Sequence, residues 1–342
     1  MKFDFVIGNP PYQEETLNNG RQSPVYHKFM EESYKISNCV ELITPARFLF
    51  NAGQTTKSWN EKMLKDKHFK VLQYEADASK VFMNTEIKGG IAITIRNSEK
   101  NYGAIEVFLP YDELKSIINT IFSNTEKEEC LDGIVSSRGC YRTNDTFYKK
   151  YTYASSRLGN GTGNMIASNF FERLPEVNDE SKLDVKSSAK MLCRINNERT
   201  YCYIKKDYLE KNEFLKSYNV AVPKSSGSGE FGEVLAETNI LEPWQGATDT
   251  FISIGIFNSL YEAKSLQKYL KTKFLRTLLG IKKVTQDNPK GVWSLIPILD
   301  FTENSHINWS KSVKEIDKQL YKKYKLSKEE IEFIETHVKE ME

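Results

Sequence analysis

The chain has 342 residues, of which 39% are hydrophobic and 27% are charged, and its formal net charge is +2. A chain of this length and composition has room for two domains with buried cores. It contains no run of about 18 apolar residues and no basic segment followed by an apolar one at its start, so we expect neither a membrane span nor a secretory signal.

The cysteines and histidines give no sign of metal chemistry. Five cysteines are scattered along the chain without a CxxC pair, and four histidines show no HExxH spacing. This pattern predicts reduced thiols, a cytoplasmic protein and no metal site. A net charge so close to zero neither requires nor excludes nucleic acid, because a local basic stripe is enough to bind a phosphate backbone.

The first ~120 residues alternate strand and helix signals, as α/β domains do. Residues 3–7 (FDFVI) predict a buried strand that ends at Gly8. A helix is expected over 23–36, with Ser23 as its N-cap and Pro24 at the first helical position. Further strands are predicted at 40–44, 71–74 and 91–95, and a further helix at 59–67.

The character of the sequence changes near residue 125, where strands become shorter and glycine and serine cluster. Ser259 and Glu262 form a capping-box pattern that predicts one long helix ending at Gly280, and Ser327 begins a last helix that runs to the end. We expect three regions, at 1–125, 126–300 and 301–342, the last of them a helical tail.

The segment Asn9-Pro10-Pro11-Tyr12 follows the first predicted strand directly. Asn9 and Pro10 each precede a proline and are therefore held extended, which leaves the Asn9 side-chain oxygen and the Pro10 carbonyl as acceptors. Tyr12 adds a flat face. Open α/β sheets bind ligands at this end of a strand.

An exocyclic amino group on a planar base matches this arrangement. Its two N–H groups would meet the two acceptors and its ring would stack on Tyr12. Acceptors that pull on those hydrogens localise the nitrogen lone pair and stabilise positive charge during attack. Such a base must first be flipped out of a duplex. The alternative is a proline-rich turn that only ends the strand.

The segment resembles the catalytic motif of N6-adenine DNA methyltransferases, in the TaqI-like branch and the type IIG restriction-modification enzymes. Four further stretches are similar to that branch: ELITPARFLFNAG (41–53), VFMNTEIKGGIAITIRN (81–97), YLKTKFLRTLLGIKKVTQ (269–286) and INWSKSVKEIDKQLYKKYKLSKEEIEFIE (307–335). The resemblance implies that Asn9, Pro10, Pro11 and Tyr12 are catalytic and that Phe82 is a second aromatic wall. It also implies a partial Rossmann-like methyltransferase sheet followed by an α+β target-recognition domain.

The same resemblance implies that S-adenosylmethionine binds mostly outside this chain, because its glycine-rich loop lies upstream of the catalytic motif in this branch. Three explanations stay open: a truncated product, one half of a split enzyme, or a donor site further downstream. The downstream candidates are the GxGxxG at 227–232 and the segment 239–251. Both lack the tight strand–turn–helix context of a donor loop, and we interpret the first as a flexible or DNA-contacting loop.

Residues 126–300 contain basic and aromatic residues on predicted loops that suit contact with double-stranded DNA. The expected contacts are Arg138, Tyr141, Arg142, Lys149, Lys150, Tyr151, Arg157, Lys224, Lys282 and Lys283. The sequence thus predicts part of an adenine-specific DNA methyltransferase that is inactive without its donor-binding half. A second polypeptide would carry that half if the enzyme is split. The alternative is a non-catalytic DNA-binding specificity module, or a remnant of a restriction-modification enzyme.

Overall fold

The computed structural model describes residues 3–14, 22–85, 87–122, 129–159, 161 and 163–341. The chain forms two compact units that do not follow sequence order. The first comprises Met1–Asn119, Ser228–Glu233 and Gly280–Gln286, and the second comprises Thr120–Gly227, Val234–Leu279 and Asp287–Glu342. Two short segments from the second half of the sequence, 228–233 and 280–286, therefore belong to the first unit.

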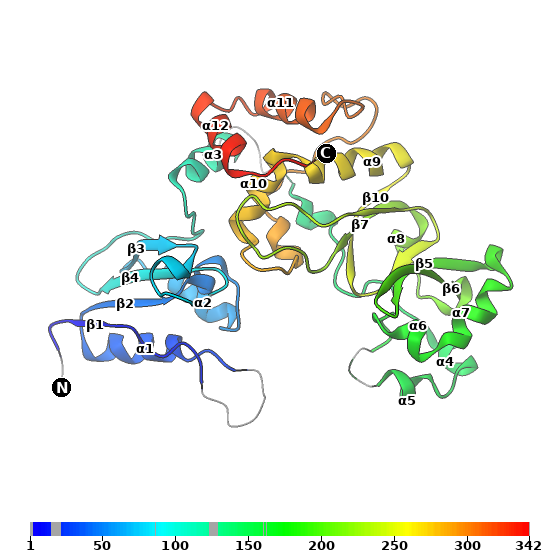
Figure 1. The fold of residues 1–342 in the computed structure, drawn as a ribbon, viewed down its shortest axis with the longest axis horizontal. Helices are drawn as coiled ribbons and strands as arrows, with labels where there is room; N and C mark the ends of the chain where they lie inside the picture. The colour runs from blue at the N-terminus through cyan, green and yellow to red at the C-terminus, as the bar shows by residue number, and fades with distance from the viewer. Residues whose placement is uncertain are drawn as a thin grey trace. The chain divides into compact units, whose positions relative to one another are not determined.

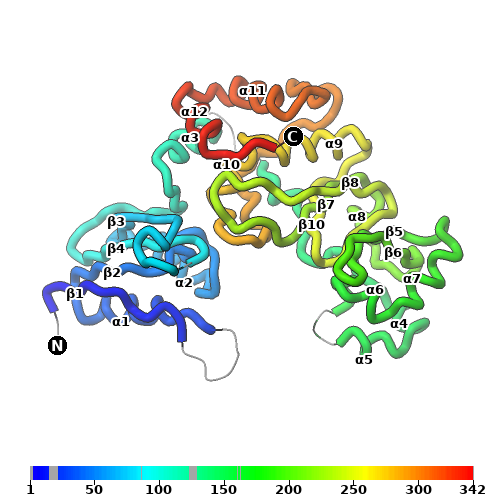
Figure 2. The backbone as a smooth tube through the Cα atoms, in the orientation of Figure 1, coloured from blue at the N-terminus to red at the C-terminus, as the bar shows by residue number. Residues whose placement is uncertain are grey.

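The first unit contains a four-stranded sheet in the order β1-β2-β4-β3 (Figure 1). Its strands are β1 (Val6–Gly8), β2 (Cys39–Pro45), β3 (Phe69–Glu75) and β4 (Ile91–Asn97). β1 is parallel to β2, and the other two pairings are antiparallel. All four strands expected from the sequence are present, and Figure 2 traces their path in blue to cyan.

The helices of this part of the chain are α1 (Tyr26–Ile36), α2 (Lys57–Lys65) and α3 (Asp112–Phe122). The predicted start of α1 was wrong: no side chain caps it, and it begins after Val25. Ser23 and Pro24 instead take part in a short antiparallel bridge with residues 13 and 14. Because the carbonyl of Ser23 accepts the Glu14 N–H, this residue is fixed outside the helix.

The sheet of the first unit buries one face. Val40 and Leu42 of β2 pack with Met30 of α1 and Trp59 of α2 in a single hydrophobic cluster. The outward residues of β1 are exposed, Ile7 at 73%. Among the described residues β1 pairs on one side only, so the sheet has an apolar edge strand. The prediction of a buried strand over 3–7 was wrong in this respect, because no described element covers the outward side of β1.

The second unit contains two three-stranded sheets, ordered β10-β7-β8 and β6-β5-β9. Its strands are β5 (Ser188–Ile195), β6 (Glu198–Lys205), β7 (Tyr218–Pro223), β8 (Asn239–Leu241), β9 (Gln245–Ala247) and β10 (Phe251–Phe257). Its shorter helices are α4 (Asp145–Lys150), α5 (Ala154–Leu158), α6 (Phe170–Arg173), α7 (Pro175–Lys182) and α8 (Glu213–Lys216). The fold is thus mixed α/β, with several sheets. No helix within the described ranges is both long and apolar enough to cross a membrane.

The long helix predicted from Ser259 is in fact two helices, α9 (Leu260–Lys271) and α10 (Lys273–Lys282). Thr272 between them has an extended backbone. The buried carboxylate of Asp317 accepts the N–H groups of Lys273 and Phe274 at 3.0 and 2.9 Å and so caps the second helix. Gly280 does not end α10, because it lies inside the helix where the Phe231 ring packs closely.

Capping boxes begin the three long C-terminal helices. Those at Ser259 and Ser327 confirm the prediction, although α12 (Lys328–His337) stops short of the chain end. The box formed by Ser312 and Glu315 begins α11 (Val313–Lys323), a helix that the sequence reading missed. The Ser-x-x-Glu pattern was available there and would have located the helix.

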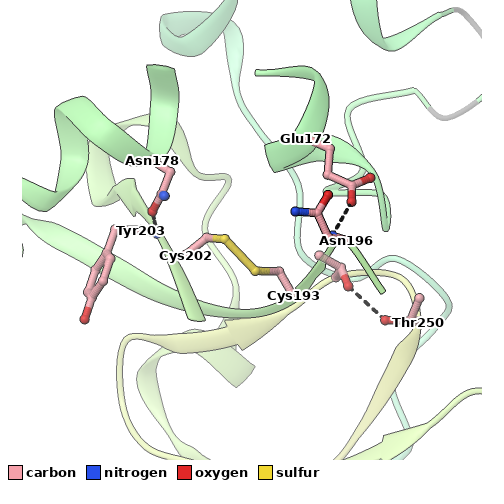
Figure 3. Close-up of a disulfide and its surroundings, with 8 residues drawn as sticks. Glu172, Asn178, Cys193, Asn196, Cys202, Tyr203 and Thr250 are labelled. Atoms are coloured by element: carbon pink, nitrogen blue, oxygen red, sulfur yellow. Dashed lines mark hydrogen bonds between the residues drawn. A yellow bond between two sulfur atoms is a disulfide. The ribbon is translucent and has the colours of Figure 1, made fainter. Parts of the chain in front are cut away.

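One expectation about the cysteines was wrong. The β5–β6 hairpin places Cys193 and Cys202 on neighbouring strands, and a disulfide joins them (Figure 3). Cys39, Cys130 and Cys140 are not in disulfides. The prediction failed because the two sulfur atoms are brought together by strand pairing, which the spacing of nine residues does not reveal.

Candidate functional site

The turn after β1 lies where two parallel strands end. β1 leads into Asn9 and the parallel β2 ends at Pro45, so both carboxyl ends meet at one edge of the sheet. Tyr12 is held there by its backbone, because its carbonyl accepts the Val25 N–H at 3.0 Å just before α1. Topology therefore places the aromatic ring at the end of the sheet where open α/β folds bind ligands.

A cavity of about 300 Å³ opens beside this turn within the first unit. It is lined by Tyr12, Gln13, Pro24, Tyr26, Pro45, Arg47, Gly53, Gln54, Thr85 and Ile87. Tyr12 is half-buried, and its hydroxyl is shielded from solvent without a hydrogen-bond partner among the described residues. Burial raises the pKa of Tyr12, so its phenol stays neutral near pH 7. The ring offers a neutral aromatic wall to whatever enters.

Two further residues of the cavity were not anticipated from the sequence. Arg47 follows β2, and its Nε donates to the carbonyl of Lys88. Its stem packs so closely that a Cβ at Gly89 would lie 2.8 Å from the Arg47 Cγ. Tyr26 is buried at the start of α1, and burial raises its pKa to about 12. The sequence signal for Arg47 was its position two residues after Pro45, the proline that ends β2.

Asn9 and Pro10 keep their acceptors available. Asn9 is exposed, and within the described ranges neither its side chain nor the Pro10 carbonyl has a hydrogen-bond partner. Pro11 is exposed as well. None of these three is among the residues that line the cavity, so the structure places Tyr12 in its wall and the two acceptors just before it in the chain.

Phe82, the expected second aromatic wall, is half-buried and is not among the lining residues. Its N–H donates to the Ala78 carbonyl at 2.8 Å. The same segment reaches the cavity three residues further on, through Thr85 and Ile87. A role for Phe82 in stacking stays a prediction.

The glycine-rich loop at 227–232 is closed by a carboxylate of its own chain. The N–H groups of Ser228 and Gly229 donate to Glu233 at 2.7 and 3.1 Å, in the manner of an anion-binding nest. Lys283 donates to the same carboxylate. The N–H groups of Ser228 and Gly229 are therefore bonded to a carboxylate of this chain and are not offered to a cofactor phosphate or carboxylate. The same hydrogen bonds argue against our interpretation of a flexible loop.

Replacing Gly229 by alanine should lower the free energy of unfolding by about 1–3 kcal/mol or more. Gly229 has φ +93°, and a Cβ would lie 2.3 Å from the backbone nitrogen of Thr285. Urea unfolding measures the loss. Gly133→Ala is the matched control, because no atom lies within 4 Å of its Cβ position. Equal stability of the two variants would contradict the packing described here.

The other candidate donor segment, 239–251, also fails to fit. It forms two short strands, β8 and β9, and leads into the strand β10 where a donor loop would need a helix. Its one acidic side chain after β9, Asp249, accepts from the Ser168 N–H at 2.9 Å and pairs with Arg138 at 2.9 Å. Neither candidate within the described residues is built to hold S-adenosylmethionine.

The residues expected to contact DNA divide by exposure. Those at the surface are Arg138, Arg142, Lys149, Lys150 and Arg157, while Lys224 and Lys282 are half-buried. Three others are corrected, because Tyr141, Tyr151 and Lys283 are buried, at 4%, 2% and 3% exposed. The Tyr141 hydroxyl bonds to Ser253, and Lys283 is paired with Glu233. The side chains of these three residues pack in the protein interior.

Comparison with known proteins finds similarity to restriction-modification methylases. Residues 1–82 match the Eco57I restriction-modification methylase family. An uncharacterized adenine-specific methylase of Mycoplasma pneumoniae (strain ATCC 29342 / M129 / Subtype 1) is 31% identical over 139 residues. That alignment covers 39% of this chain and 29% of the relative, so the chain spans less than a third of the relative's length.

Two solved structures are similar at low identity. The type IIG restriction endonuclease BpuSI has a TM-score of 0.34 at 13% identity, over 92% of this chain and 48% of that one. The type IIL restriction-modification enzyme MmeI, in complex with DNA, has a TM-score of 0.42 at 11% identity, over 97% and 56%. The Eco57I methylase match itself includes Asn9–Tyr12 and every cavity residue except Thr85 and Ile87.

Proposed function

We propose that this chain is the base-holding and DNA-reading part of an adenine-specific DNA methyltransferase. The complete enzyme would move a methyl group from S-adenosylmethionine to N6 of an adenine flipped out of a duplex. The observation that carries this proposal is the Asn9–Tyr12 turn at the carboxyl end of β1, beside a cavity of about 300 Å³ whose wall includes the Tyr12 ring. A volume of this order suits a single base.

The chain's own residues would position the acceptor nitrogen. The Asn9 side-chain oxygen and the Pro10 carbonyl would accept the two N–H bonds of the adenine amino group, while Tyr12 stacks on the ring. This support localises the nitrogen lone pair and stabilises the positive charge that develops there. S-adenosylmethionine would supply only the methyl group, from a site that we assign to another part of the enzyme.

The uncovered part of the sheet supports docking of that donor-binding part. Ile7 of β1 is 73% exposed, and Phe3 and Phe5 just before this strand are each 49% exposed. Among the described residues β1 pairs on one side only. An apolar edge of this kind is completed by another strand or covered by another layer. The donor-binding half, in the same protein or in a second polypeptide, would complete the sheet as a methyltransferase sheet.

A second candidate function is a DNA specificity module without catalysis. The observation that favours it is the closure of the GxGxxG loop by Glu233, which leaves that loop without a donor-binding role. In this case the surface cations of the second unit would still bind double-stranded DNA. The two candidates differ in whether methyl transfer ever appears.

Methyl transfer tests the proposal directly. The chain is assayed alone and joined to the coding sequence that directly precedes it in its genome, with labelled S-adenosylmethionine and unmethylated genomic DNA. In the active form, Tyr12→Ala should lower transfer roughly 5- to 150-fold, since stacking on one base contributes about 1–3 kcal/mol. Tyr12→Phe should retain activity, because the Tyr12 hydroxyl has no partner among the described residues.

The outcomes separate the candidates. Labelled N6-methyladenine that depends on the ring at position 12 supports the methyltransferase. DNA binding without any transfer, in both forms of the chain, supports the specificity module. Transfer that survives Tyr12→Ala unchanged would show that this cavity does not hold the base.

A further inference from the structure

The β5–β6 hairpin of the second unit places two arginines opposite each other. Asn196 and Asn197 join the strands with φ of 51° and 66°. Such a two-residue turn fixes the register of a hairpin, and here the register sets Arg194 directly across from Arg199. Like charges in facing positions destabilise a sheet. Glu172 does not neutralise them through an ion pair, since it accepts the Asn196 N–H at 2.9 Å (Figure 3).

A third cation completes a basic cavity at this hairpin. The cavity has a volume of about 290 Å³ and is lined by Arg194, Arg199, Pro223, Lys224, Ser225, Thr250 and Phe251. We name it the hairpin cavity. The Arg199 guanidinium lies 5.4 Å from the centroid of the Phe251 ring. Arg194 donates to the Asn197 carbonyl at 2.9 Å.

The backbone of the hairpin cavity is held firmly on its other side. The Lys224 N–H donates to the Thr250 carbonyl at 2.8 Å, and the Lys224 carbonyl accepts the Asn288 N–H at 2.8 Å. The hydroxyls of Thr248 and Thr250 bond to each other at 2.9 Å (Figure 3). These contacts fix Lys224 and a hydroxyl group beside the two arginines.

The positive charge of the hairpin cavity is not cancelled from within. No carboxylate in the described ranges forms an ion pair with Arg194, Arg199 or Lys224. The acids close by in the chain are bonded to other groups. Asp249 pairs with Arg138 at 2.9 Å, and Asp287 accepts the hydroxyl of Ser225.

We propose that the hairpin cavity binds a phosphodiester group of the DNA backbone. An anion between Arg194 and Arg199 would turn their repulsion into two charge-assisted hydrogen bonds, with Lys224 and the Thr250 hydroxyl completing the site. The sequence reading missed both arginines, because their pairing depends on the hairpin register. This inference rests on the proposed role in binding DNA, and it assigns the phosphate to specific residues.

Salt dependence of duplex binding tests the assignment. Fluorescence anisotropy with a labelled duplex of mixed sequence gives the slope of log K against log salt, in which each phosphate contact accounts for about 0.9. Because both arginines hold the same phosphate, the variant R194Q/R199Q should reduce the magnitude of the slope by about 0.9 and weaken binding roughly tenfold at about 0.1 M salt. R194K/R199K keeps both charges and should keep the slope. K311Q/K328Q removes two exposed lysines from other elements and should also keep it.

A melting measurement excludes a merely structural effect. Neutralising the facing arginines removes their repulsion, so R194Q/R199Q should melt at or above the wild-type temperature. A lower melting temperature would mean that the arginines stabilise the fold, and an unchanged slope would mean that they do not touch phosphate; either result overturns the assignment. Absence of duplex binding by the wild type would overturn both this inference and the proposed DNA partner. The expected loss of methyl transfer in Tyr12→Ala does not depend on the salt slope or the melting temperature. Failure of this inference can therefore be distinguished from failure of the proposed function.

Discussion

Asn9→Ala should reduce methyl transfer by the active enzyme about 10²–10³-fold, the effect of removing one preorganised hydrogen-bonding group from a site where charge develops. Binding of duplex DNA should stay unchanged, because Asn9 is exposed and has no partner in the described structure whose loss would unsettle the fold. Single-turnover transfer from labelled S-adenosylmethionine measures the first quantity, and anisotropy with a labelled duplex measures the second.

Asn9→Asp is the matched control for this prediction. The carboxylate keeps an acceptor oxygen at the same place, so the aspartate variant should retain more transfer than the alanine variant. Wild-type transfer in Asn9→Ala would show that the side-chain oxygen does not hold the amino group. The Asn9–Tyr12 turn would then only end β1.

Lys283→Met should lower the free energy of unfolding by about 3–5 kcal/mol, because it leaves a buried carboxylate without its counter-charge. Lys283 and Glu233 are 3% and 11% exposed at their side chains, and the lysine also donates to the Thr285 carbonyl at 3.2 Å. Urea unfolding at pH 7 measures the loss. The double variant E233Q/K283M removes both charges and should lose far less.

The pH dependence of the same pair has a definite sign. Burial acts to raise the pKa of Glu233, but hydrogen bonds from Lys283, Ser228 and Gly229 outweigh it and hold the pKa below its ordinary value of 4.5. A carboxyl with a depressed pKa in the folded state stabilises the fold above its unfolded pKa and loses this contribution as the pH falls. The stability difference between wild type and E233Q/K283M should therefore be constant above about pH 4.5 and change below it. A constant difference down to pH 2 would show that the carboxylate is not the stabilised form.

Local sequence patterns predicted the features whose interactions lie within a few residues of each other. The apolar run, the two prolines and the tyrosine located the first strand and the turn that follows it, although β1 is shorter than predicted, includes Gly8 and is mostly exposed. The capping boxes at Ser259 and Ser327 located two helix starts for the same reason, since both hydrogen bonds of a box lie within four residues.

The failures came from partners distant in sequence. Thr272 interrupts a continuous helical pattern because Asp317, which lies 44 residues after Lys273, caps the helix that follows. Lys283 looked like a surface cation because its partner Glu233 is 50 residues earlier. Arg47 gained its place in the cavity from close packing against Gly89. The two residues of each pair are far apart in the sequence, so local patterns could not predict these contacts.

The interleaving of the two units constrains how this protein can recombine. Residues 228–233 and 280–286 belong with the N-terminal sheet, and Val284 lies in the same hydrophobic cluster as Phe48 and Trp59. A chimaera cut at a single point near residue 120 would exchange these two segments together with the second unit, and the recipient would lose part of the interior of its first unit. Viable crossovers for exchanging the second unit would instead lie at the borders of both segments.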